Sequence, residues 1–85
     1  MNKIYLGGIT EKTNQKGDKY YLMNVWCNAS YNGIEGQRDN YYYIVDVEAY
    51  EAVKNIERDC EINAEIEVTE NSTKLILNGK KYNQR

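Results

Sequence analysis

The sequence predicts a small, mainly β domain with five strands and one short helix between the third and fourth strands. Two observations lead to this prediction. Five stretches of the 85-residue chain alternate in side-chain type with a period of two, which places successive side chains on opposite faces of a sheet. A single stretch, after the third of these, has apolar residues at the period of a helix. At this length we expect one domain, residues 1–85.

The first two strands are predicted to form a hairpin. Strand one covers residues 3–13, and a polar, glycine-containing loop at residues 14–18 joins it to strand two, which ends at Cys27. Gly7 and Gly8 interrupt strand one, as a β-bulge or a sharp bend would.

Strand two has one apolar face and one mixed face. The alternating set that includes Tyr21 and Met23 is apolar or small and suits a core. The other set contains Asn24, so we expect this face to meet solvent and to expose two aromatic rings, Tyr20 and Trp26.

The middle of the chain is expected to contain a loop, a strand and a helix. Residues 28–40 are polar and carry two glycines, which is typical of a long loop. Strand three covers residues 41–47, and because Asp46 shares a face with Tyr42, we expect Tyr42 to point outward. A helix follows at residues 47–59, with Asp46 as its N-cap.

The C-terminal part is expected to form the last two strands. Residues 60–69 alternate apolar side chains with a row of carboxylates. Residues 70–73 turn the chain, and the last strand contains Leu75 and Leu77. Asn78-Gly79 marks the end of that strand or a tight turn.

Composition limits the function. Ile, Leu and Val total 17 residues, and nine Tyr and one Trp complete the apolar content, so we expect a tyrosine-rich core and a dimer or higher oligomer. The chain has no histidine, no CxxC pair and no phosphate-binding glycine loop, so we expect no enzyme, cofactor or metal site. Cys27 and Cys60 are expected to be buried, reduced thiols. Without a membrane-length apolar run or a signal peptide, we expect a cytoplasmic protein that does not contact membranes.

The order of three strands, a helix and two strands is that of an OB-fold, a five-stranded, partly open barrel. With this order, the stretch KGDKYYLMNVW at residues 16–26 and the YYY at residues 41–43, the chain resembles small OB-fold single-stranded DNA-binding proteins of bacteria, phages and mobile elements. The resemblance implies non-sequence-specific binding of single-stranded DNA across the first three strands. The chain departs from this family in its net charge of −2 and its basic C-terminus.

Single strands are held by cations that meet phosphates and by flat rings that stack on bases. The stacking rings are hypothesised to be Tyr5, Tyr20, Trp26 and Tyr42. The phosphate contacts are hypothesised to be Lys12, Lys16, Lys19 and Arg38.

Charge distribution supports an alternative. Residues 46–70 have a net charge of −7, whereas residues 1–45 and 71–85 carry +1 and +4. Separate surfaces of opposite charge indicate separate partners. The chain is then a small inhibitor of the phage or plasmid type, which binds a basic protein partner through the acidic face of residues 48–70, above all through Glu61, Glu65 and Glu67.

Overall fold

A computed structural model of the chain describes residues 3–31 and 33–85. The described part is mainly β, as predicted, and its strands form two antiparallel sheets with the orders β3-β2-β1-β4 and β5-β6-β7. These sheets do not close into one barrel, so the expected five-stranded barrel is not confirmed. The elements are β1 (Ile4–Thr13), β2 (Lys19–Tyr31), β3 (Ile34–Ile44), α1 (Val47–Val53), β4 (Glu61–Ile62), β5 (Ala64–Val68), β6 (Thr73–Leu77) and β7 (Lys80–Asn83).

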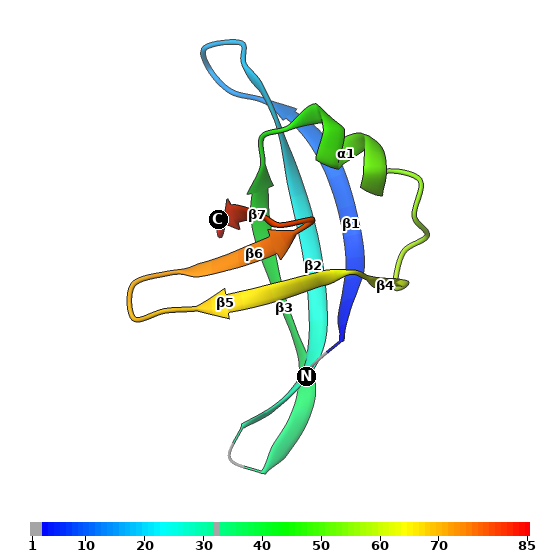
Figure 1. The fold of residues 1–85 in the computed structure, drawn as a ribbon, viewed down its shortest axis with the longest axis vertical. Helices are drawn as coiled ribbons and strands as arrows, with labels where there is room; N and C mark the ends of the chain where they lie inside the picture. Colours follow the sequence, from blue (N-terminus) through cyan, green and yellow to red (C-terminus); the bar gives the residue numbers. More distant parts are fainter. Residues whose placement is uncertain (1–2, 32) are drawn as a thin grey trace.

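The two sheets cross each other and enclose the core. The long strands β1, β2 and β3 run along the longest axis of the molecule, β5 and β6 cross them, and α1 lies near one end of the first sheet (Figure 1). Apolar residues of both sheets and of α1 pack together between them, because each of these elements turns a set of apolar side chains inward. The most deeply buried members are Leu6, Met23, Val25, Tyr42, Ile44 and Leu75.

The glycine pair of β1 forms the predicted bulge. The register between β1 and β2 shifts between Leu6 and Gly8. A Cβ atom on Gly7 would collide with the Oδ1 atom of Asn24 in the neighbouring strand. The missing side chain of Gly7 therefore leaves room for the Asn24 side-chain amide at the bulge, and Ile9 continues β1 on the core side.

Residues 28–40 do not form the expected loop. The pairing of β2 with β3 continues from Asn28↔Gln37 to Tyr31↔Ile34, so this segment is a two-stranded arm (residues 28–31 and 34–37). The arm projects from one end of the molecule (Figure 1). Its β3 strand is exposed on both faces, and Ile34 is 73% exposed. Polar residues therefore suit both faces of the arm, which is why the apolar alternation that signals a strand is missing.

The strand expected at residues 60–69 is split at Asn63. Ile62 in β4 pairs with Ile4 in β1, whereas Ala64 begins β5, which pairs with β6. The chain thus passes from the first sheet to the second through a single residue. A further strand that was not expected, β7, follows a tight turn in which Asn78 (φ 52°) and Gly79 (φ 79°) are both left-handed, as a two-residue hairpin requires.

The faces of β3 are the reverse of the expected ones. Tyr42 is 0% exposed, whereas Tyr41 and Tyr43 are 46% and 39% exposed. The outward prediction for Tyr42 relied on Asp46, but this carboxylate has partners in the second sheet. It accepts hydrogen bonds from the Tyr82 hydroxyl at 2.7 Å and the Lys80 ammonium at 3.2 Å, so a charged residue is satisfied at the margin of the core.

Helix α1 begins as predicted but ends earlier. Asp46 is at the N-cap position, yet its side chain makes no capping hydrogen bond because it is bonded to Tyr82 and Lys80. The helix ends at Val53 instead of residue 59, and the following turn leads to Asp59, whose φ is 67°. No helix in the described part of the chain is long and apolar enough to cross a membrane.

The cysteines are unpaired but not both buried. Cys27 is half-buried beside the core, whereas Cys60 is exposed. Cys60 belongs to the segment between α1 and β4, which runs along the edge of β1. Its thiol is therefore not buried, contrary to the prediction.

Candidate nucleic-acid interface

The outer face of the first sheet carries a group of tyrosines. Core residues alternate with outward residues along each strand, and residues directly opposite each other share a face. Across this outer face, Tyr5 lies opposite Trp26, Lys12 lies opposite Tyr20, Tyr41 lies opposite Asn24 and Tyr43 lies opposite Leu22. We call the five rings on this surface the aromatic face: Tyr5, Tyr20, Trp26, Tyr41 and Tyr43.

At one end of the aromatic face, two rings are already engaged with each other. The rings of Tyr5 and Trp26 stack with centroids 4.3 Å apart and planes inclined by 20°. The indole Nε1 of Trp26 donates a hydrogen bond to Oδ1 of Asp59 at 2.8 Å, and Asp39 lies opposite Trp26 on β3. Two carboxylates thus flank Trp26, so this end of the face disfavours phosphate groups.

At the other end, tyrosine rings lie beside a lysine. Tyr20 and Tyr43 pack edge to face with centroids 5.8 Å apart, and Tyr41 and Tyr43 are exposed. Lys12 lies beside Tyr20 on the neighbouring strand. The described residues include no ion-pair partner for Lys12.

A hollow of about 350 Å³ lies between these two ends. Arg58 stands at its side, and its Nε donates a hydrogen bond to the carbonyl oxygen of Gly7 at 3.2 Å. The hollow is lined by Gly7, Gly8, Ile9, Thr10, Leu22, Asn24, Tyr41 and Arg58. A flat ring thus finds small and apolar groups below it and a cation beside it.

The predicted contact residues divide between surfaces. Lys12, Tyr5, Tyr20 and Trp26 belong to one face by strand register, as expected. Lys16 lies in the turn between β1 and β2, next to the carboxamide of Asn14, which accepts a hydrogen bond from its backbone N–H at 2.9 Å.

The other three predicted contacts are not on the aromatic face. Tyr42 is buried, and burial raises the pKa of its hydroxyl. Lys19 alternates with Tyr20 and points to the opposite side, where it forms an ion pair with Glu11 at 3.0 Å. A hydrogen bond to this carboxylate raises the pKa of Lys19. Arg38 lies opposite Cys27, on the core side of the sheet.

The sequence prediction missed three residues of this surface. The expectation that Tyr42 points outward places Tyr41 and Tyr43 in the core by alternation. The apolar Ile44 shares a face with Tyr42 and would have favoured the opposite assignment, which the structure has. Arg58 was assigned to the end of a longer helix. Its place beside Gly7 depends on the path of the chain after α1, for which the sequence carries no local signal.

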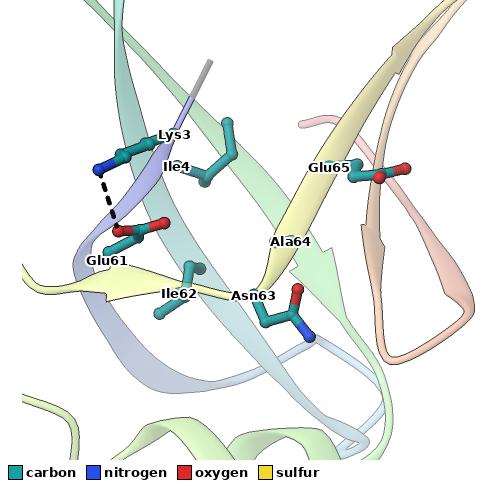
Figure 2. Close-up of a pocket in the computed structure, with 7 residues that line it drawn as sticks. All are labelled: Lys3, Ile4, Glu61, Ile62, Asn63, Ala64 and Glu65. Atoms are coloured by element: carbon teal, nitrogen blue, oxygen red, sulfur yellow. Dashed lines mark ion pairs between the residues drawn. The ribbon is translucent and has the colours of Figure 1, made fainter. Parts of the chain in front are cut away.

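The carboxylates of the alternative hypothesis do not form one row. Glu61 belongs to β4 in the first sheet and pairs with Lys3 at 3.9 Å, whereas Glu65 and Glu67 belong to β5 in the second sheet. Figure 2 shows the Lys3–Glu61 pair on one side of a pocket of about 470 Å³ and Glu65 on the other, pointing away. Glu67 pairs with Lys81 at 3.1 Å. Two of the three carboxylates thus have a lysine partner, which weakens an acidic docking surface.

Comparison of the chain with models of protein families, with curated proteins and with solved structures finds no match.

Proposed function

We propose that the chain binds single-stranded nucleic acid, DNA in the first instance, on the aromatic face. The observation that supports this proposal most is the exposure of Tyr41 and Tyr43 beside Tyr20 on two adjacent strands. Rings of this size are usually buried, because burial of an aromatic side chain is strongly favourable. Each base that stacks on such a ring contributes about 1–3 kcal/mol, without regard to sequence.

The positions of the cations suggest how a strand lies on this face. Lys12 and the Arg58 contact at Gly7 are on the β1 side, whereas the exposed tyrosines are on β2 and β3. A strand whose phosphates pass Lys12 and Lys16 would place its bases over the tyrosines of β2 and β3 and over the hollow beside Arg58. Gly8 and Lys12 are four residues apart, which corresponds to about 13 Å along a strand. Lys16 in the hairpin turn extends this line of positive charge.

The path of the chain supports an OB-like, partly open barrel as the scaffold. After α1, β4 returns to pair with β1 and continues into β5 across Asn63. The second sheet approaches β3 at its other margin, through an antiparallel bridge between Tyr42 and Gln84 and a hydrogen bond from the Arg85 N–H to the Tyr41 carbonyl oxygen at 2.9 Å. The three-stranded meander, the helix and this return fit the OB-fold resemblance, in which the first sheet carries the ligand.

The proposal is tested by titrating the protein into a fluorescently labelled oligo-dT at low salt and following the fluorescence anisotropy. Tyr41→Ala and Tyr43→Ala should each weaken binding about fivefold or more, because each removes a stacking ring. Tyr41→Phe keeps the ring and should bind like the wild type. Val68→Ala, at an exposed position of the second sheet, is the control for a surface change elsewhere.

Binding should also weaken as salt is added. Contacts from Lys12 and Lys16 to about two phosphates predict a log–log slope of about −1.4 for a single strand. No change in anisotropy at low salt with micromolar protein would overturn the proposal.

A further inference from the structure

The loop after α1 holds Arg58 in a defined position. The Asp59 N–H donates a hydrogen bond to the Leu6 carbonyl oxygen at 2.7 Å, and the Leu6 N–H donates one to the Cys60 carbonyl oxygen at 3.0 Å. These two backbone bonds fix the loop to the edge of β1. The bond from Arg58 Nε to Gly7 then orients the guanidinium over the bulge. Its terminal Nη atoms make no hydrogen bond or ion pair with any described residue, so they are available to a ligand.

The hollow beside Arg58 has a floor that suits a flat ring. Gly7 and Gly8 bring no side chains, and Leu22 supplies an apolar contact. A Cβ on Gly8 would meet nothing within 4 Å, so this part of the surface is open. The side-chain amide of Asn24 donates to the Asn40 carbonyl oxygen at 3.3 Å, which leaves its Oδ1 acceptor on the Gly7 side of the hollow.

We propose that this hollow holds one guanine base of the bound strand. The two Nη groups of Arg58 would donate to guanine O6 and N7, the bidentate pairing that suits this base. The Asn24 Oδ1 would accept from a ring or exocyclic N–H, and the ring of Tyr41 would pack against the base. Adenine and cytosine present an amino donor where guanine has O6, so they would face the guanidinium with the wrong polarity. This inference rests on the proposed function and adds a base preference at one position to otherwise sequence-tolerant binding.

A phosphate group is the competing ligand for Arg58, since a guanidinium binds phosphate with the same fork. The two ligands differ in what surrounds them. A phosphate is best held by several polar donors, whereas the Leu22 side chain and the glycine backbone make the floor of the hollow mainly apolar. The floor thus favours a base, and the experiment separates the two ligands.

The test compares three labelled oligonucleotides of equal length with wild-type protein: oligo-dT, the same oligomer with one central dG, and that oligomer with 7-deazaguanine in place of the guanine. We expect the dG oligomer to bind about fivefold or more tightly than oligo-dT. The 7-deaza base lacks the N7 acceptor but keeps the Watson–Crick edge, so it should lose most of this gain. Because all three measurements use unaltered protein, they do not depend on the folding of a variant.

Variants then assign the preference to Arg58. Arg58→Lys keeps the charge but not the fork, so it should bind oligo-dT nearly as well as the wild type and lose the preference for dG. Arg38→Gln removes a positive charge from the opposite face and should retain the preference.

Two results would overturn the inference while leaving the proposed function intact. The first is that wild-type protein binds oligo-dT and the dG oligomer with equal affinity. The second is that Arg58→Gln weakens the binding of both oligomers equally, which would identify Arg58 as a phosphate contact. If none of the oligonucleotides binds, the proposed function fails and the guanine site fails with it.

Discussion

Tyr42 and Tyr43 are adjacent residues of the same type that point in opposite directions, so replacing each with alanine tests the orientation of β3. Tyr42 is 0% exposed in the core, and Tyr43 is 39% exposed on the aromatic face. Removing a fully buried aromatic ring leaves a cavity and costs about 3–5 kcal/mol. Tyr43→Ala removes mainly the edge-to-face contact with Tyr20, which contributes about 0.5–1.5 kcal/mol.

The assay for both variants is urea unfolding followed by Trp26 fluorescence, with the free energy of unfolding obtained from the midpoint and slope. Tyr42→Ala should lose about 4 kcal/mol of stability, a large part of the total for a small domain. Tyr43→Ala should lose about 1 kcal/mol and keep its fold while binding oligo-dT less tightly.

The control for the ring of Tyr42 is Tyr42→Phe, which removes only the hydroxyl. That buried hydroxyl has no hydrogen-bond partner of good geometry in the described structure, so stability should be retained or rise. Equal losses in Tyr42→Ala and Tyr43→Ala, or a larger loss in Tyr43→Ala, would refute the assigned orientation of β3.

Four further predictions concern the sheets and their assembly. The hydrogen bond from Tyr82 lowers the pKa of Asp46, so the Asp46 carboxylate stabilises the fold above about pH 4. This stabilisation is lost as the pH falls through the lowered pKa, and acid unfolding of Asp46→Asn should not show that loss. Burial raises the pKa of Tyr82 to about 12, so the stability that Tyr82 contributes is complete below about pH 10 and is lost as the pH rises through about 12. In alkaline unfolding, Tyr82→Phe should not show this loss of stability. Gly7→Ala should cost about 1–3 kcal/mol in thermal or urea unfolding because its Cβ collides with Asn24, whereas Gly36→Ala, whose Cβ meets nothing within 4 Å, should cost less than half as much. The small aliphatic content and the exposed tyrosines predict a dimer or higher oligomer, and light scattering that reports a monomer at high micromolar concentration would contradict this prediction.

Much of the candidate site could be predicted where the residues of a single strand show which of its faces is buried. In β2, the apolar set with Tyr21 and Met23 is buried, so the face predicted for Tyr20 and Trp26 is correct, although both rings are half-buried rather than exposed. The glycine bulge of β1, the start of α1 after Asp46 and the Asn78-Gly79 turn were likewise readable, because each depends on neighbours in the chain. Local sterics and the period-two pattern act over a few residues, which is the range that a single sequence reports.

The remaining features depend on residues that are distant in the sequence. Tyr82, in β7, makes it possible for Asp46 to lie at the core margin, and this reverses the assignment of Tyr41, Tyr42 and Tyr43. Arg58 reaches Gly7 only because the loop after α1 pairs with the edge of β1.

The sequence by itself determined a mainly β chain, the faces of β2 and the bulge of β1, because backbone geometry and alternation are local properties. The tertiary structure decided which face of β3 is buried, that residues 28–40 form an arm rather than a loop, and that Asn63 divides one strand between two sheets. Each of these depends on whether a partner strand or solvent covers a face. A polar side chain is compatible with either outcome until its partner is known, since a hydrogen bond from a distant residue can satisfy it as well as water can.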